Sequence, residues 1–189
     1  MTLDGDGDTE TYSASSIVIA TPDGELKSQD VFSLQWTHAD GSIINAAHFE
    51  SDNGDLVTEL RLELDASEWL VSGKFKDKDL TAKIDGNTNP DSTVSHTRRL
   101  RERLAAKDAV GSKFATTRWT PSADPSRFVT AETSIEKDLG NGLFAARESM
   151  EGLEVSYVAE ASSGGAVSAE MSVGQIEMKI RRIHTSGSF

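Results

Sequence analysis

The feature that most constrains the fold is the alternation of apolar and polar residues between Val31 and Ile84, which turn residues interrupt at regular intervals. Asp40-Gly41 and Asn53-Gly54 are typical two-residue hairpin loops, and Ala66-Ser67 and Asp77-Lys78 are weaker candidates. Because side chains alternate between the faces of a strand, four such hairpins fix which residues share a face. They predict a five-stranded antiparallel meander with one apolar face, formed by Phe32, Leu34, Trp36, Ile43, Ala47, Phe49, Leu60, Leu62, Leu64, Trp69, Val71, Phe75, Leu80, Ala82 and Ile84.

The residues on either side of this segment continue the pattern. Upstream, a further hairpin is expected around Pro22-Asp23-Gly24. Downstream, residues 85–92 have the composition of a loop, and residues 92–108 form the one convincing helix. Asp91 or Ser92 can cap this helix, and its apolar stripe consists of Thr97, Leu100 and Leu104.

After the helix the chain returns to strand patterns. Strands are expected at about 113–120, 127–137, 143–150, 153–161 and 167–183. In the last of these the alternation changes phase, and a bulge at Gly174-Gln175 would keep the apolar residues on one side.

These patterns predict an all-β fold of about eleven strands and one helix. We expect a flexible acidic N-terminus over residues 1–11 and a single domain over residues 12–189. A sheet of this size either closes into an antiparallel barrel or curls into a strongly curved, half-open sheet. Both would enclose a hydrophobic cavity, as in lipocalin-like architecture or the curved sheets of lipoprotein carriers.

Composition narrows the function. A formal net charge of -12 disfavours nucleic-acid binding, because the protein would repel phosphate. The absence of cysteine excludes disulfides and thiolate metal sites, and no cofactor or metal motif occurs. No apolar run is long enough for a membrane helix, so a soluble protein is expected, either cytoplasmic or exported with its signal removed. The oligomeric state is left open.

Two histidines lie in the predicted meander. The register places His38 on the apolar face at the cavity rim, near Trp36, Asn45 and Trp69. These four residues form the first candidate site, with the tryptophans as walls and His38 as a candidate catalytic group. His48 is placed on the polar face, where a solvated ladder with Glu59 and Lys74 is the expected role.

A second candidate site lies near the C-terminus. A hairpin at Glu151-Gly152 would put Glu148 and Tyr157 on one apolar face, where they could act in acid–base catalysis or contact a ligand. Basic residues from Arg98 to Lys107 give the predicted helix the one positive patch on the chain.

The sequence therefore favours a binding or carrier protein for a small, mainly apolar molecule held in the cavity. The first alternative is a cofactor-independent isomerase, cyclase or hydratase that uses acid–base groups in the same cavity. The second is a structural or protein-interaction module.

Overall fold

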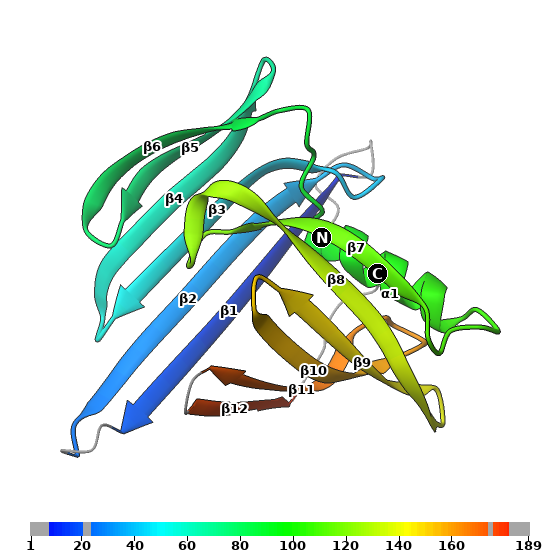
Figure 1. Ribbon diagram of the computed structural model, residues 1–189. Coiled ribbons are helices and arrows are strands. Elements are labelled where there is room, and N and C mark those ends of the chain that lie inside the picture. Colours follow the sequence, from blue (N-terminus) through cyan, green and yellow to red (C-terminus); the bar gives the residue numbers. More distant parts are fainter. Residues whose placement is uncertain (1–7, 21–23, 174–175, 182–189) are drawn as a thin grey trace. The chain divides into compact units, whose positions relative to one another are not determined.

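The computed structural model describes residues 8–20, 24–173 and 176–181. Within them the protein is all-β with one helix, and its strands form two six-stranded antiparallel sheets (Figure 1). Each sheet is a meander whose strands are neighbours in sequence order. No hydrogen-bonded ladder joins the two sheets in the described ranges, so the strands do not form one continuous closed sheet. The prediction of an all-β fold with one helix is confirmed.

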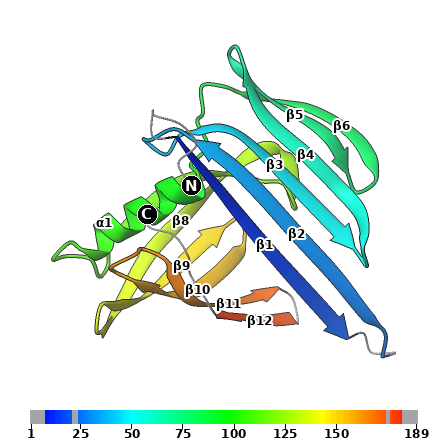
Figure 2. The same cartoon turned by 180° about the vertical axis from the view of Figure 1, so that it is seen from behind.

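The chain divides into two compact units, each built on one sheet. The first unit runs to Ser92 and also includes the later segment Trp119–Phe128; the second comprises Thr93–Arg118 and the residues from Val129 onward. The first sheet contains β1 (Thr9–Ala20), β2 (Leu26–Thr37), β3 (Ile43–Asp52), β4 (Asp55–Asp65), β5 (Glu68–Phe75) and β6 (Lys78–Asp85). Figure 2 shows this meander from behind.

Positive backbone φ angles mark the tight hairpins of the first sheet. Asn53 (φ 52°) and Gly54 (φ 89°) form the predicted two-residue loop between β3 and β4, because asparagine and glycine tolerate this conformation. The Ala66-Ser67 loop is also confirmed. The predicted loop at Asp77-Lys78 is displaced by one residue, since Phe75 pairs with Lys78. The turn near Asp40 is longer than predicted and spans residues 38–42.

One β-bulge overturns the prediction of a single apolar face. Ser51 pairs with Leu56 but Glu50 pairs with Thr58, so Val57 is an extra residue in β4. A one-residue shift moves every later side chain to the opposite face. His48 therefore shares a face with Leu60, although the sequence had placed the two on opposite faces.

The apolar side chains of the first sheet consequently change face between β3 and β4. From β4 to β6 they lie on the face that we call the covered face, because Trp119 and Phe128 of the same unit pack against it. Trp69 contacts Phe128 edge to face, with ring centroids 6.0 Å apart. The buried members of this core are Ile43, Ala46, Leu60, Leu62, Trp69 and Val71.

The second sheet carries the helix. It contains β7 (Lys113–Thr120), β8 (Asp124–Gly140), β9 (Leu143–Met150), β10 (Leu153–Glu160), β11 (Ala166–Val173) and β12 (Ile176–Arg181), and α1 (Thr93–Leu104) precedes it. The predicted helical stripe is confirmed at Leu100 and Leu104, which are buried against Ile135, Phe144 and Ala159. Amphipathic packing of this kind gives a short helix most of its stability.

Two predictions at the chain ends are wrong in part. The last strand was expected to run continuously to residue 183, but β11 and β12 form an antiparallel hairpin with Val173 opposite Ile176. The bulge predicted at Gly174-Gln175 lies outside the described residues. The flexible N-terminus was expected to reach residue 11, whereas β1 begins at Thr9. Pro22 and Asp23 of the first predicted turn are also outside the described residues, although Ala20 pairs with Leu26 as that hairpin requires.

Candidate functional site

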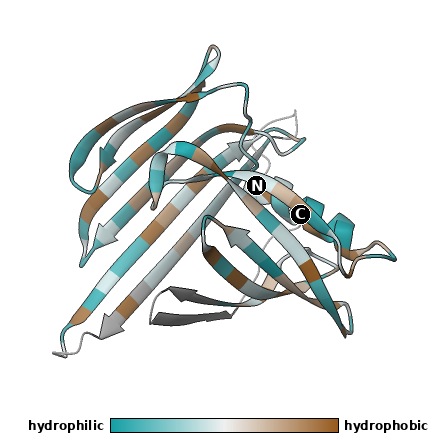
Figure 3. Ribbon diagram, viewed as in Figure 1, coloured by the Kyte–Doolittle hydropathy of each residue, from teal (hydrophilic) through white to brown (hydrophobic). Residues whose placement is uncertain are grey.

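The face of the first sheet opposite the covered face, which we call the open face, is apolar over β1 to β3. Tyr12 pairs with Leu34 and Phe32 pairs with Phe49, so these side chains share it. Figure 3 shows that hydrophobic and hydrophilic residues alternate along β2, which places them on opposite faces of the sheet. Of the eight large apolar side chains that are exposed in the described part of the chain, five follow this register on the open face: Tyr12, Val18, Leu26, Phe32 and Leu56.

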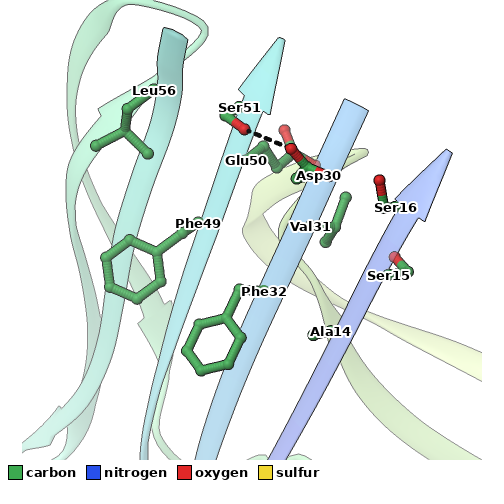
Figure 4. Close-up of a pocket in the computed structure, with 10 residues that line it drawn as sticks. All are labelled: Ala14, Ser15, Ser16, Asp30, Val31, Phe32, Phe49, Glu50, Ser51 and Leu56. Atoms are coloured by element: carbon green, nitrogen blue, oxygen red, sulfur yellow. Dashed lines mark hydrogen bonds between the residues drawn. The ribbon is translucent and has the colours of Figure 1, made fainter. Parts of the chain in front are cut away.

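A shallow pocket of about 390 Å³ lies on the open face. The Phe32 and Phe49 side chains lie side by side, with ring centroids 6.2 Å apart and planes inclined by 37° (Figure 4). Leu56 extends the apolar surface beyond Phe49. Ser15, Ser16, Asp30 and Ser51 line the polar side of the pocket, and the Ser51 hydroxyl donates a hydrogen bond of 3.4 Å to Asp30.

This arrangement is suited to binding. Apolar surface concentrated on one face of a soluble domain marks a site for a ligand or a partner. Small-molecule sites combine an apolar lining with a few polar groups that set orientation. Two inclined aromatic rings provide the lining here, and the hydroxyl groups and the Asp30 carboxylate at the edge provide the polar contacts.

The structure does not bring together the four residues of the predicted site around His38. Trp36 and Asn45 pair with each other on the open face, and both are half-buried. Trp69 lies on the covered face, 1% exposed, where its indole N–H donates to the Thr88 carbonyl. His38 follows the end of β2, with its side chain 57% exposed and 3.3 Å from Asp8. The predicted grouping of these four residues is therefore wrong, because the bulge at Val57 separates Trp69 from Trp36.

His48 is buried instead of solvated. Its Nδ1 lies 2.8 Å from the Ser33 hydroxyl, and its Nε2 lies 3.2 Å from both Glu50 Oε1 and the Ser122 hydroxyl. Burial lowers the pKa of His48, and Glu50 offsets part of that shift. Burial also raises the pKa of Glu50, but hydrogen bonds with Ser122, His48 and Thr58 outweigh it and leave that pKa below its ordinary value. At neutral pH the pair is therefore a neutral imidazole beside a carboxylate.

Glu148 and Tyr157 occupy the same face of the second sheet, as predicted. Val155 pairs with Glu148 and Tyr157 pairs with Ala146, which confirms the register of this hairpin. Arg118 donates to both carboxylate oxygens of Glu148, at 2.8 and 2.6 Å. A second contact of 2.8 Å joins Arg118 to Nδ1 of His96. Because a bidentate arginine holds the carboxylate, Glu148 is an ion-pair partner in this structure and not an isolated acid.

Tyr157 lies beside this ion pair. Burial and the nearby Glu148 carboxylate raise its pKa to about 12. Its hydroxyl has no hydrogen-bond partner among the described residues. The neighbouring Thr133 hydroxyl donates to Glu148, over 3.4 Å. The arrangement keeps the phenol protonated at neutral pH.

Sequence reasoning missed Arg118, His96 and Ser122. Arg118 could have been found, because it alternates in phase with Phe114 and Thr116 along β7, and an arginine on the inward side of a strand requires a buried partner. No signal in the sequence indicated Ser122, which meets His48 from a loop 74 residues away. In the described ranges no cluster of acidic and histidine side chains could hold a metal ion.

No family model matches the chain, and no curated protein matches it. The structure is similar to the crystal structure of a beta-barrel-like protein of the domain of unknown function DUF1849 from Brucella abortus. The TM-score is 0.66 at 14% sequence identity, over 92% of this chain and 80% of that one. At this identity the similarity supports the fold alone. No helix in the described part of the chain could cross a membrane.

Proposed function

We propose that the protein binds a small, mainly apolar molecule on the open face of β1 to β3. The observation that carries this proposal is the pocket formed by Phe32, Phe49 and Leu56. Desolvating an aromatic side chain releases about 1.5–3 kcal/mol when its burial is complete. Even partial coverage of two rings would therefore give a measurable affinity.

The wider open face supports the same proposal. Leu34 and Trp36, both half-buried, continue the apolar surface from the pocket along β2. Asn45, opposite Trp36, supplies an amide that can hydrogen-bond to a polar group of the ligand. In this proposal Trp36 and Asn45 contact the ligand, whereas Trp69 belongs to the core of the covered face.

The two carboxylates that line the pocket, Asp30 and Glu50, are already engaged by other side chains. Asp30 accepts a hydrogen bond from Ser51, and Glu50 is 5% exposed and lies 3.2 Å from Nε2 of His48. Proton transfer needs a titratable group within hydrogen-bond reach of the substrate. Binding without turnover is therefore the function that this pocket supports best.

The proposal is tested by titrating the protein with the neutral fluorescent probe N-phenyl-1-naphthylamine. We expect Phe32→Ser to raise the dissociation constant about tenfold, because losing about 1.4 kcal/mol of apolar contact changes affinity by that factor. Leu139→Ser is the matched control, since Leu139 is 46% exposed and Phe32 is 37% exposed. Equal affinities for the two variants would contradict the proposal, as would an absence of probe binding by the unmodified protein.

A further inference from the structure

The four edge strands of the two sheets differ in how they are protected. An edge strand exposes unpaired backbone groups, and proteins usually prevent unwanted pairing there with charged side chains. In the described ranges the edges are β1, β6, β7 and β12. Charged residues number four of eight in β6, two of eight in β7 and three of six in β12. β1 has a single charged residue, Glu10, among twelve.

The open-face side chains of β1 are also unusual for an edge. Tyr12 is 68% exposed and Val18 is 62% exposed. Between them on the same face lie only the small residues Ala14 and Ser16. A long edge strand with few charged residues and with exposed apolar side chains is a template for adding another strand.

We propose that β1 pairs antiparallel with β1 of a second copy of this chain, around a two-fold axis that passes through Ser15. Two-fold symmetry is the commonest arrangement of protein dimers, and it places the same surface on both sides of the contact. The resulting ladder would give hydrogen-bond partners to the unpaired backbone N–H and C=O groups on the outer side of each β1. It would join the first sheets of the two copies into one continuous sheet.

The sequence of β1 selects this register. An axis perpendicular to the sheet keeps both open faces on one side, and an axis at either Ala14 or Ser15 pairs most of the strand. With the axis at Ser15, Tyr12 of each copy lies opposite Val18 of the other, an aromatic and β-branched pair that stabilises sheets. With the axis at Ala14, Glu10 would face Val18 instead.

Charge also favours the antiparallel arrangement around Ser15. Glu10 lies at one end of β1, so antiparallel pairing places it opposite the uncharged last residue of the other strand. In-register parallel pairing would set the two Glu10 side chains against each other, which is destabilising. Because β1 carries both Tyr12 and Val18, a second copy of β1 supplies both halves of this pairing by symmetry. A second copy is therefore the occupant that the sequence of β1 fits.

The dimer would enlarge the apolar surface of the open face. Ala14, Ser15 and Ser16 line the pocket on the side of β1. A second β1 beside them would extend this wall and would bring the two pockets next to each other across the axis. The inference does not depend on the proposed ligand, because strand pairing can be measured without one.

Cysteine cross-linking of the full chain tests the register directly, because the protein contains no cysteine of its own. With the axis at Ser15, the two residues at position 15 are directly opposite, with Cβ atoms about 5 Å apart, close to disulfide geometry. The two residues at position 10 would be about 34 Å apart, at about 3.4 Å per residue. We therefore expect Ser15→Cys to form a disulfide-linked dimer at least about tenfold faster than the matched control Glu10→Cys on mild oxidation.

Charge substitution at the axis gives an independent readout by sedimentation equilibrium. Ser15→Lys and Ser15→Glu should each weaken dimerisation about fivefold, because each places like charges opposite each other. An equimolar mixture of the two should restore a dimer of about the original affinity. The exposed Ser67→Lys is the control and should leave dimerisation unchanged. A monomeric unmodified protein up to submillimolar concentration, equal cross-linking at positions 10 and 15, or no rescue in the mixture would each overturn the proposal.

Discussion

At the scale of single residues, His48 is the clearest case of burial changing chemistry. Its side chain is 3% exposed and lies between Ser33 on one ring nitrogen and Glu50 with Ser122 on the other. A neutral ring that donates from Nε2 to Glu50 and accepts at Nδ1 from Ser33 satisfies both nitrogens. Ser122 belongs to the segment Trp119–Phe128, which packs on the covered face, and its hydrogen bond with Glu50 holds that segment on the sheet.

This pair makes stability dependent on pH. Since burial lowers the pKa of folded His48 below 6.5, the unfolded chain takes up a proton first, and the free energy of unfolding should fall as pH decreases below about 6.5. The lowered pKa of Glu50 extends the loss below pH 4.5. Urea unfolding followed by tryptophan fluorescence at pH 7.5 and 5.5 measures the effect. In His48→Gln the difference in the free energy of unfolding between pH 7.5 and pH 5.5 should be smaller, because the variant lacks the titrating imidazole. An unchanged difference in that variant would contradict the assignment of this pH dependence to His48.

At the scale of elements, β5 packs so closely on β4 that it requires a glycine. Gly73 has φ +135°, and a Cβ there would lie 2.0 Å from the Glu59 carbonyl oxygen. The glycine is opposite Leu60, one of the buried residues of the covered face. A side chain at this position would push apart the two strands that carry most of that core.

We therefore expect Gly73→Ala to lower the free energy of unfolding by about 3 kcal/mol, from backbone strain and steric repulsion together. Gly54→Ala is the matched control, because Gly54 has φ +89° but a methyl group added there would meet nothing within 4 Å. Its cost should be only about 1 kcal/mol. Thermal and urea denaturation of the two variants measure the difference, and equal losses would show that the close approach of β4 and β5 is not the determining factor.

At the scale of the whole molecule, net charge opposes compactness. A formal charge of -12 on 189 residues creates self-repulsion that folding must overcome. Added salt screens such repulsion, with a Debye length of about 8 Å at physiological ionic strength. The same repulsion acts between two copies, so association through β1 is favoured by screening.

Calorimetry at increasing sodium chloride concentration tests the effect of net charge on folding. Screening should raise the free energy of unfolding by about 1 kcal/mol between low and physiological ionic strength, which corresponds to about 2–4 °C in melting temperature for a chain of this size. The protein should be kept dilute, so that any dimer is dissociated. A melting temperature that falls with salt would mean that favourable ion pairs, such as Lys83–Glu68, outweigh the net repulsion.

Local patterns in the sequence were sufficient to predict much of the structure. Alternation and turn dipeptides predicted the all-β class and the pairing of Phe32 with Phe49, and capping residues with an apolar stripe predicted the helix. They also placed Glu148 and Tyr157 on one face, because a tight hairpin fixes its own register. These features depend on residues close together in the chain.

Tertiary structure decided which way the side chains face. The bulge at Val57 adds one residue to β4, and the alternating sequence around it is compatible with either register. The observed register buries Leu60 and Leu62 with Trp69 under Trp119 and Phe128, which come from far along the chain. It also exposes Phe32 on the open face and buries His48. A one-residue shift reverses both faces of a strand, and only the packing of a distant segment against one face can select between the two outcomes.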